Sequence, residues 1–195
     1  MRKVFLLLAI GLLCSCNKNE EDLPVGSYDY DAKQLSGTYV LSKVFWSGTP
    51  TDLNNDGISY HDLLENEFAT LPGYYEPYNQ ATVKAVANKE QQAIIVNLQL
   101  PYPDFSQKEK QYFVSKLSYL PISIPGASDS KKLSFKTMNF KNDDYFALRG
   151  IEKISIEKIS PKEIQVRAYC LLYNLETQTP VKNYLHYTYQ RMDGQ

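Results

Sequence analysis

The last third of the chain constrains the fold most, because its apolar and polar residues alternate with a period of two. The even-numbered residues from 164 to 172 are all apolar, and Leu185, Tyr187 and Tyr189 alternate with polar neighbours. Such alternation is typical of a β-strand with one buried face. Turn sequences at 160–163 and 177–180 precede the two stretches, so we expect these strands to pair antiparallel.

Strands of the same kind are predicted along most of the chain, at about 38–46, 81–87, 94–100, 111–120, 131–138 and 151–159. Many antiparallel strands joined by short turns must curl or close to hide their edges. The sequence therefore predicts one all-β domain over residues 36–195, as an antiparallel up-and-down barrel or a strongly curved sheet. An open sandwich of two sheets is the structural alternative.

The N-terminus has the parts of a lipoprotein signal peptide. A basic start is followed by an apolar run from Val4 to Leu13 and then by Cys14-Ser15-Cys16, and this run is too short for a permanent transmembrane helix. The ending resembles the bacterial lipobox, which implies cleavage after residue 15 and a lipid such as palmitate on Cys16. An ordinary cleaved signal with incidental cysteines is the alternative.

The segment after the lipobox is polar and acidic. Residues 16–35 begin with Cys16, continue with Asn17-Lys18-Asn19-Glu20-Glu21-Asp22 and contain Pro24 and Gly26, so we expect an acylated tether rather than a domain. The acidic run resembles the tag that carries lipoproteins of some Gram-negative bacteria to the outer face of the outer membrane. The expected location is therefore the cell outer membrane, lipid-anchored and facing outward.

A calcium-type loop follows the first long strand. Asp52, Asn54 and Asp56 occupy the first, third and fifth positions of such a loop, and Gly57 stands at its sharp turn. The carbonyl of Ile58 would supply the seventh position. Alternate residues of a tight loop project oxygens inward, and glycine can adopt the positive φ that this turn needs.

The loop departs from the pattern at its twelfth position, where Leu63 replaces the usual glutamate. We expect Asp62 to close the coordination shell from the first turn of a short helix over 59–66. This oxygen set suits Ca²⁺, and its role would be to pin the loop to the barrel rim. The alternative is a metal-free turn, because Asn and Asp favour such bends unaided.

Three segments together resemble bacterial lipocalin-like lipoproteins. Gly37-Thr38-Tyr39 is similar to the G-x-W opening of lipocalins, with Tyr39 at the position of the tryptophan. The loop at 52–57 with Asp62-Leu63-Leu64 looks like the insert that follows strand one in that group, and 187–191 looks like its terminal strand. The resemblance implies an eight-stranded barrel able to hold a small apolar ligand, and it implies no reaction.

The remaining residues favour a non-catalytic protein. Lys plus Arg number 21 and Asp plus Glu 22, which argues against a nucleic-acid partner. There are two histidines in the chain, and no nucleophile elbow, phosphate loop or zinc spacing appears. Cys170 is predicted to be a core residue and His186 a surface or pocket-lining one. A surface glycan-binding protein is the alternative function, with Tyr74, Tyr75 and Tyr78 as stacking residues.

Overall fold

The protein is described here by a computed structural model. It describes residues 28–29, 32–76, 79–87, 92–123, 132–133, 135, 137–139 and 150–192. The predicted signal peptide, Cys16 and most of the predicted tether lie outside the described residues. Within the described part, no helix has the length and apolar character needed to span a bilayer.

The secondary structure consists almost entirely of strands. The elements, in chain order, are β1 (Tyr28–Asp29), α1 (Ala32–Leu35), β2 (Gly37–Trp46), the 3-10 helix η1 (Phe68–Thr70), β3 (Gln80–Ala87), β4 (Gln92–Ser106), β5 (Gln111–Tyr119), β6 (Ile122–Ser123), β7 (Lys132–Leu133), β8 (Met138–Asn139), β9 (Ile151–Ile159), β10 (Glu163–Asn174) and β11 (Thr179–Arg191).

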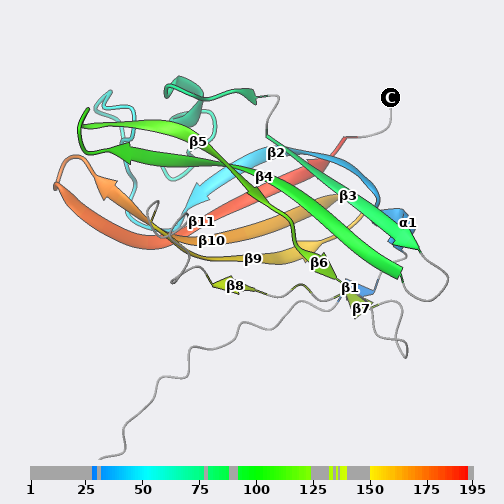
Figure 1. Cartoon of the computed structure of the whole chain (residues 1–195). Coiled ribbons are helices and arrows are strands. Elements are labelled where there is room, and N and C mark those ends of the chain that lie inside the picture. The colour runs from blue at the N-terminus through cyan, green and yellow to red at the C-terminus, as the bar shows by residue number, and fades with distance from the viewer. Residues whose placement is uncertain are drawn as a thin grey trace, which may run out of the picture.

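One antiparallel sheet forms the body of the molecule. Its strand order is β5-β4-β3-β2-β11-β10-β9-β8, with β6 paired to β4, and β1 pairs separately with β7. The sheet curls so strongly that β4 and β5 cross over β9 and β10 (Figure 1). Among the described residues no ladder joins β5 to β8, so the sheet is a half-barrel. The all-β, strongly curved prediction is confirmed, and the alternative of an open two-sheet sandwich is wrong.

The alternation in the sequence sets which face of each strand is buried. β10 and β11 pair over their whole length, with Val166 opposite Tyr187 and Ile164 opposite Tyr189. All four of these side chains are almost completely buried inside the curled sheet. Residues between them, such as Gln165 and Thr188, face outward and are partly exposed. Because a one-residue slip would exchange the two faces, this pattern also fixes the register.

Tyrosine hydroxyls connect the two walls of the half-barrel across its interior. Tyr187 and Tyr189 on β11 donate to the carbonyls of Pro101 (3.0 Å) and Gln99 (2.7 Å) on β4. In the opposite direction, Tyr102 on β4 donates to the carbonyl of Leu171 on β10 (3.1 Å). Because these rings are buried, each hydroxyl needs such a partner, and the interior is packed by the protein's own side chains.

Pairing with β5 makes β4 longer than the predicted strand at 94–100. β3 pairs with β4 only as far as Leu98, whereas β5 pairs with β4 as far as Ser106. Beyond Leu98, Pro101 and Pro103 turn their nitrogens to the side that has no neighbouring strand, so no ladder bond is lost. Tyrosine hydroxyls then occupy carbonyls on that free side.

The predicted strand at 131–138 is wrong in extent. The described residues there form two short strands, β7 and β8, which pair with different partners, β1 and β9. Leu133 and Phe135 alternate with polar neighbours, but Thr137 and Met138 reverse the pattern, so the alternation covers only part of the predicted strand.

The folded domain begins before residue 36. Leu35 in α1 is fully buried, and the Tyr39 hydroxyl lies within hydrogen-bond distance of the carbonyls of Leu35 (2.9 Å) and Ser160 (3.1 Å). The Arg191 guanidinium at the end of β11 donates to the carbonyls of Gln34 (2.5 Å) and Ser36 (2.8 Å). The last eight residues of the predicted tether therefore include two elements: α1, whose Leu35 packs with the domain, and β1, which pairs with β7.

Candidate functional site

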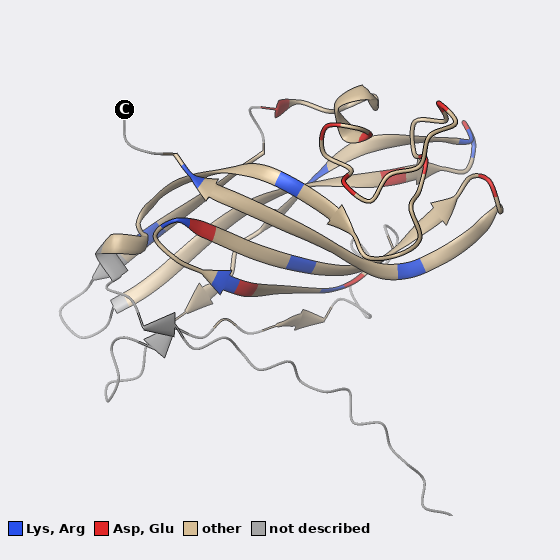
Figure 2. Ribbon diagram, turned by 180° about the vertical axis from the view of Figure 1, so that it is seen from behind, with Lys and Arg blue, Asp and Glu red and all other residues tan. Residues whose placement is uncertain are grey.

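The predicted calcium loop lies in the long connection between β2 and β3. Thr51 and Tyr60 exchange two backbone hydrogen bonds, of 3.1 and 3.0 Å, which close the loop at its base. The chain then returns along β2, where Trp46 and Val44 bond to the backbones of His61 and Leu63. Acidic residues gather on this connection at one end of the half-barrel (Figure 2).

The side-chain oxygens of the first three predicted ligands turn into the loop. The N–H of Asp56 lies 3.1 Å from Oδ1 of Asp52 and 3.0 Å from Oδ1 of Asn54. Oδ2 of Asp52 accepts from the N–H of Gly57 (2.8 Å), and Oδ1 of Asp56 accepts from the N–H of Ile58 (2.8 Å). The structure therefore brings Asp52, Asn54 and Asp56 together around one bend.

The backbone of the loop follows the predicted course at Gly57. This glycine has φ of 88°, and Asn55 also has a positive φ, of 62°. Nothing lies within 4 Å of a β-carbon built on Gly57, so the positive φ, and not lack of space, makes glycine suitable here. The side chain of Ile58 points to solvent, with 54% of its surface exposed.

Apolar side chains on both sides of the loop fix it to the core. Leu53 lies inside the loop and is buried, and Leu63, Leu64 and Phe68 are buried just after it. The acidic bend is thus held against a packed surface by its second residue and by the segment that follows.

Glu67 is a buried acidic residue beneath the loop, and the sequence reasoning missed it. Its side chain is fully buried, and its Oε2 accepts from the N–H groups of Leu53 (2.9 Å) and Asn54 (3.0 Å). Burial raises its pKa from 4.5 to about 7, the two backbone N–H groups oppose this rise, and the carboxylates of Asp52 and Asp56 add to it. The signal in the sequence is that this acidic residue directly precedes a core phenylalanine, Phe68, at the end of the turn that follows the loop.

Asp62, the predicted closing ligand, lies elsewhere. Its carboxylate contacts Nζ of Lys43 at 3.8 Å, and both side chains are about half exposed. Residues 59–66 do not form the predicted helix: 64–67 form a turn, and the helical residues are those of η1, Phe68–Thr70. Asp62 pairs with Phe45 of β2, and His61 and Leu63 bond to the backbone of the same strand, so these residues lie beside β2 and the helical turn comes later in the chain.

The side chains that converge in the loop offer oxygen atoms as metal ligands, and none of them offers nitrogen or sulfur. Within the part of the chain that the structure describes, no group of three or more His, Cys, Asp or Glu side chains is close enough to hold a metal ion. The set that does converge is two aspartates and the amide oxygen of Asn54, with the Glu67 carboxylate bonded to the backbone of the same loop. Such a set suits a hard cation, and its oxygens are at present turned to backbone N–H groups.

The tyrosines of the glycan hypothesis are not equivalent. Tyr74 packs against the core, and its hydroxyl accepts a bond of 3.0 Å from the side-chain amide of Asn79. Tyr75 is 54% exposed, and Tyr78 lies outside the described residues. Of the two described rings, Tyr75 presents the greater exposed surface.

Cys170 and His186 lie where the alternation predicts. Cys170 is completely buried, and burial raises the pKa of its thiol. His186 lies on the outer face of β11, where its Nε2 is 2.7 Å from Oγ of Ser47 and its Nδ1 is 4.0 Å from Glu157. Burial and the nearby Arg167 lower its pKa, and Glu157 opposes this.

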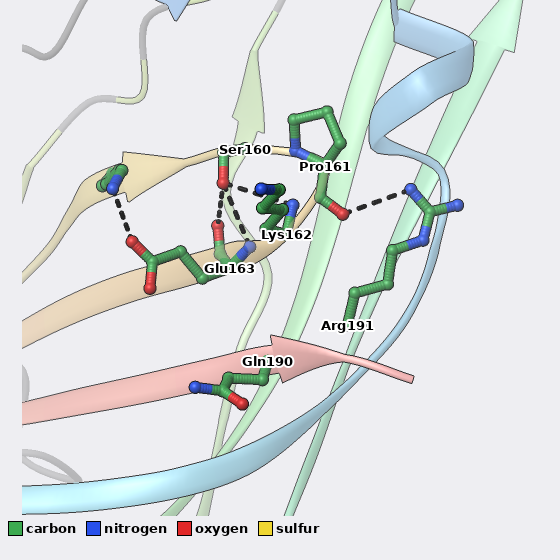
Figure 3. A pocket seen from close by; sticks show the side chains of 7 residues that line it. Ser160, Pro161, Lys162, Glu163, Gln190 and Arg191 are labelled. Atoms are coloured by element: carbon green, nitrogen blue, oxygen red, sulfur yellow. Dashed lines mark hydrogen bonds and ion pairs between the residues drawn. The ribbon is translucent and has the colours of Figure 1, made fainter. Parts of the chain in front are cut away.

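An open pocket of about 850 Å³ lies at the turn between β9 and β10 and is shown in Figure 3. Three of its charged side chains are engaged within the fold, because Lys158 pairs with Glu163 and Arg191 donates to backbone carbonyls, whereas Lys162 is exposed. Ser160 Oγ accepts from the N–H of Glu163 and lies 3.3 Å from that of Lys162. The pocket thus consists mainly of groups that tie strand ends together.

Comparisons with known proteins gave no relative: no protein-family model, no curated protein and no solved structure matches the chain.

Proposed function

We propose that the chain is a non-catalytic lipoprotein of the outer membrane, whose lipocalin-like half-barrel carries a structural calcium loop. The observation that carries the proposal is the convergence of the Asp52, Asn54 and Asp56 oxygens on one loop that is fixed to the core. In this proposal the lipid on Cys16 holds the domain at the membrane.

The convergence favours a structural cation over a catalytic one. The loop supplies oxygen donors of the kind that Ca²⁺ prefers, from Asp52, Asn54 and Asp56, with the Ile58 carbonyl and Asp62 as the other predicted donors. Buried Leu53 and Leu63 attach the loop to the barrel, so a bound ion would brace the longest connection of the domain. Calcium sites of extracellular modules bind in roughly the 10⁻⁴–10⁻³ M range and are occupied where the ion is plentiful.

The packed interior supports a role that does not depend on a large ligand. Tyr102, Tyr187 and Tyr189 bridge the walls, and their buried rings fill the space between them. Solvent extraction of the purified protein followed by mass spectrometry tests this point, because recovery of a stoichiometric apolar molecule would make the protein a carrier.

The anchor is tested by the Cys16→Ala variant of the full chain. Wild-type protein should incorporate labelled palmitate and sediment with the outer membrane, whereas the variant should do neither. Palmitate labelling of the variant at the wild-type level would contradict the assignment of Cys16.

The calcium loop is tested by thermal unfolding of the full chain in detergent, with calcium and with a chelator. Wild-type protein should melt at a higher temperature in calcium, because a ligand that binds only the folded state stabilises it. The double variant Asp52→Ala/Asp56→Ala should lose this difference. Equal melting of wild-type protein in the two conditions would exclude a structural calcium site.

A further inference from the structure

Glu67 has an unsatisfied carboxylate oxygen beneath the acidic loop. Oε2 accepts hydrogen bonds from the N–H groups of Leu53 and Asn54, so the carboxylate faces the start of the loop. Its other oxygen, Oε1, is buried and has no hydrogen-bond partner among the described residues. The side chain as a whole has no exposed surface.

A buried carboxylate oxygen without a donor is costly, because it has lost its hydration and gained nothing in return. The cost is relieved if the oxygen takes up a proton or if it faces a cation. The aspartates next to it bear on this choice. Three carboxylates on one short segment repel each other, and a divalent cation removes that repulsion whereas a proton on Glu67 relieves it only in part.

We propose that Glu67 is the ligand that completes the cation shell of the loop, in the role that the twelfth-position glutamate would have and that we assigned to Asp62 from the sequence. This rests on the proposed calcium loop, whose other donors are Asp52, Asn54 and Asp56. Glu67 comes fifteen residues after Asp52, further than in the usual loop, because residues 61–63 lie beside β2 before the chain turns back.

The contacts of Asp62 agree with this exchange of roles. Its carboxylate lies against Lys43 and is about half exposed to solvent. The Glu67 carboxylate, in contrast, is already ordered by two backbone donors from the loop itself. A cation that binds Oε1 of Glu67 would therefore meet a preoriented oxygen, which lowers the entropic cost of binding. The carboxylates of Asp52 and Asp56, which accept from backbone N–H groups and are not gathered around one point with Glu67, would turn to the ion on binding.

The experiment measures calcium affinity by titration calorimetry on the full chain in detergent, for wild type and three variants. Glu67→Gln keeps an oxygen that can accept from Leu53 and Asn54 but removes the charge. Asp62→Asn removes the charge of the competing candidate. Glu65→Gln removes one charge from an exposed neighbour and is the matched control.

Wild-type protein should bind one calcium ion. Glu67→Gln should weaken calcium binding by roughly 10–100-fold, as the loss of a group close to a metal commonly does. Asp62→Asn and Glu65→Gln should change the affinity by less than about threefold. Wild-type affinity in Glu67→Gln would overturn this inference and leave the calcium loop intact. Absence of calcium binding in wild type would instead overturn the proposed function.

Folding of the Glu67 variant is checked in chelator, where its thermal transition should be cooperative. If Glu67→Gln does not fold, Glu67→Asp provides the test, because it keeps the charge and withdraws the oxygens by one methylene. A folded Glu67→Asp that binds calcium as tightly as wild type would also overturn the inference.

Discussion

Three single residues show how local chemistry and burial act together in this protein. Gly57 adopts a φ of 88° that its position in the loop requires. The Glu67 side chain is completely buried, and this burial raises the pKa of its carboxyl group to about 7. His186 is half-buried on the outer face among Phe45, Tyr184, Ser47, Glu157 and Arg167. Each residue type can be seen in the sequence, whereas the surroundings that perturb Glu67 and His186 cannot.

The lowered pKa of His186 predicts a pH dependence of stability. The unfolded chain binds the proton more readily than the folded one, so the stabilisation is present above pH 6.5 and is lost as the pH falls through the lowered folded value. Between about pH 6.5 and 5, wild type should therefore lose more free energy of unfolding than His186→Gln, by under about 1 kcal/mol because the ring is partly exposed.

Urea unfolding at a series of pH values measures this difference. Comparison with the variant is needed because Glu67 titrates in the same range with the opposite sign: its raised pKa makes the folded state more stable as the pH falls. His61→Gln is the control on the only other histidine in the chain. Parallel pH profiles for wild type and His186→Gln would contradict the prediction.

At the scale of elements, pairs of strands are joined by two kinds of contact. Neighbouring strands pair through backbone ladders, as β10 and β11 do over twelve residue pairs. Strands on opposite walls are joined by tyrosine hydroxyls that reach backbone carbonyls, from β11 to β4 and from β4 to β10. The second kind supplies hydrogen-bond donors to carbonyls of β4 beyond the end of its pairing with β3.

Removal of one such hydroxyl should measurably destabilise the half-barrel. Tyr187→Phe leaves the carbonyl of Pro101 buried without its donor, which should cost about 1–3 kcal/mol of unfolding free energy in denaturant titrations. Tyr184→Phe is the matched control, because that ring lies on the outer face of the same strand. Equal losses of unfolding free energy in the two variants would contradict the prediction that the bond between the walls stabilises the half-barrel.

At the scale of the whole molecule, the two ends of the described chain meet at one end of the half-barrel. Arg191, at the end of β11, donates to the carbonyls of Gln34 and Ser36 beside α1, and it lies 3.4 Å from that of Pro161 in the turn after β9. The acidic loop lies in the connection after the opposite end of β2. One residue thus holds three distant segments together.

Arg191→Lys should destabilise the protein although it keeps the charge. A lysine cannot bond to several carbonyls in different directions at once, so we expect a loss of about 1–3 kcal/mol in the free energy of unfolding. Lys162→Ala, an exposed residue of the same pocket, should change it by less than about 0.5 kcal/mol. An unchanged urea midpoint for Arg191→Lys would contradict this role.

The sequence by itself determined the strands, their buried faces and the acidic bend. β2, β3, β5, β9 and β10 lie within a few residues of their predicted ranges, whereas β11 begins at Thr179, well before the predicted alternation at Leu185. The agreement is local because a period of two and turn residues act over short distances. The positive φ of Gly57 and the burial of Cys170 follow from the same local signals.

Only the tertiary structure decided how far β4 extends, that the sheet stays a half-barrel among the described residues, and that Glu67 rather than Asp62 bonds to the acidic loop. These features depend on contacts between segments rather than on local patterns. The extent of β4 depends on its pairing with β5, and the position of Glu67 depends on the return of residues 61–63 beside β2. Local patterns fix which face a residue presents, whereas its neighbour across the fold is set by packing of the whole chain.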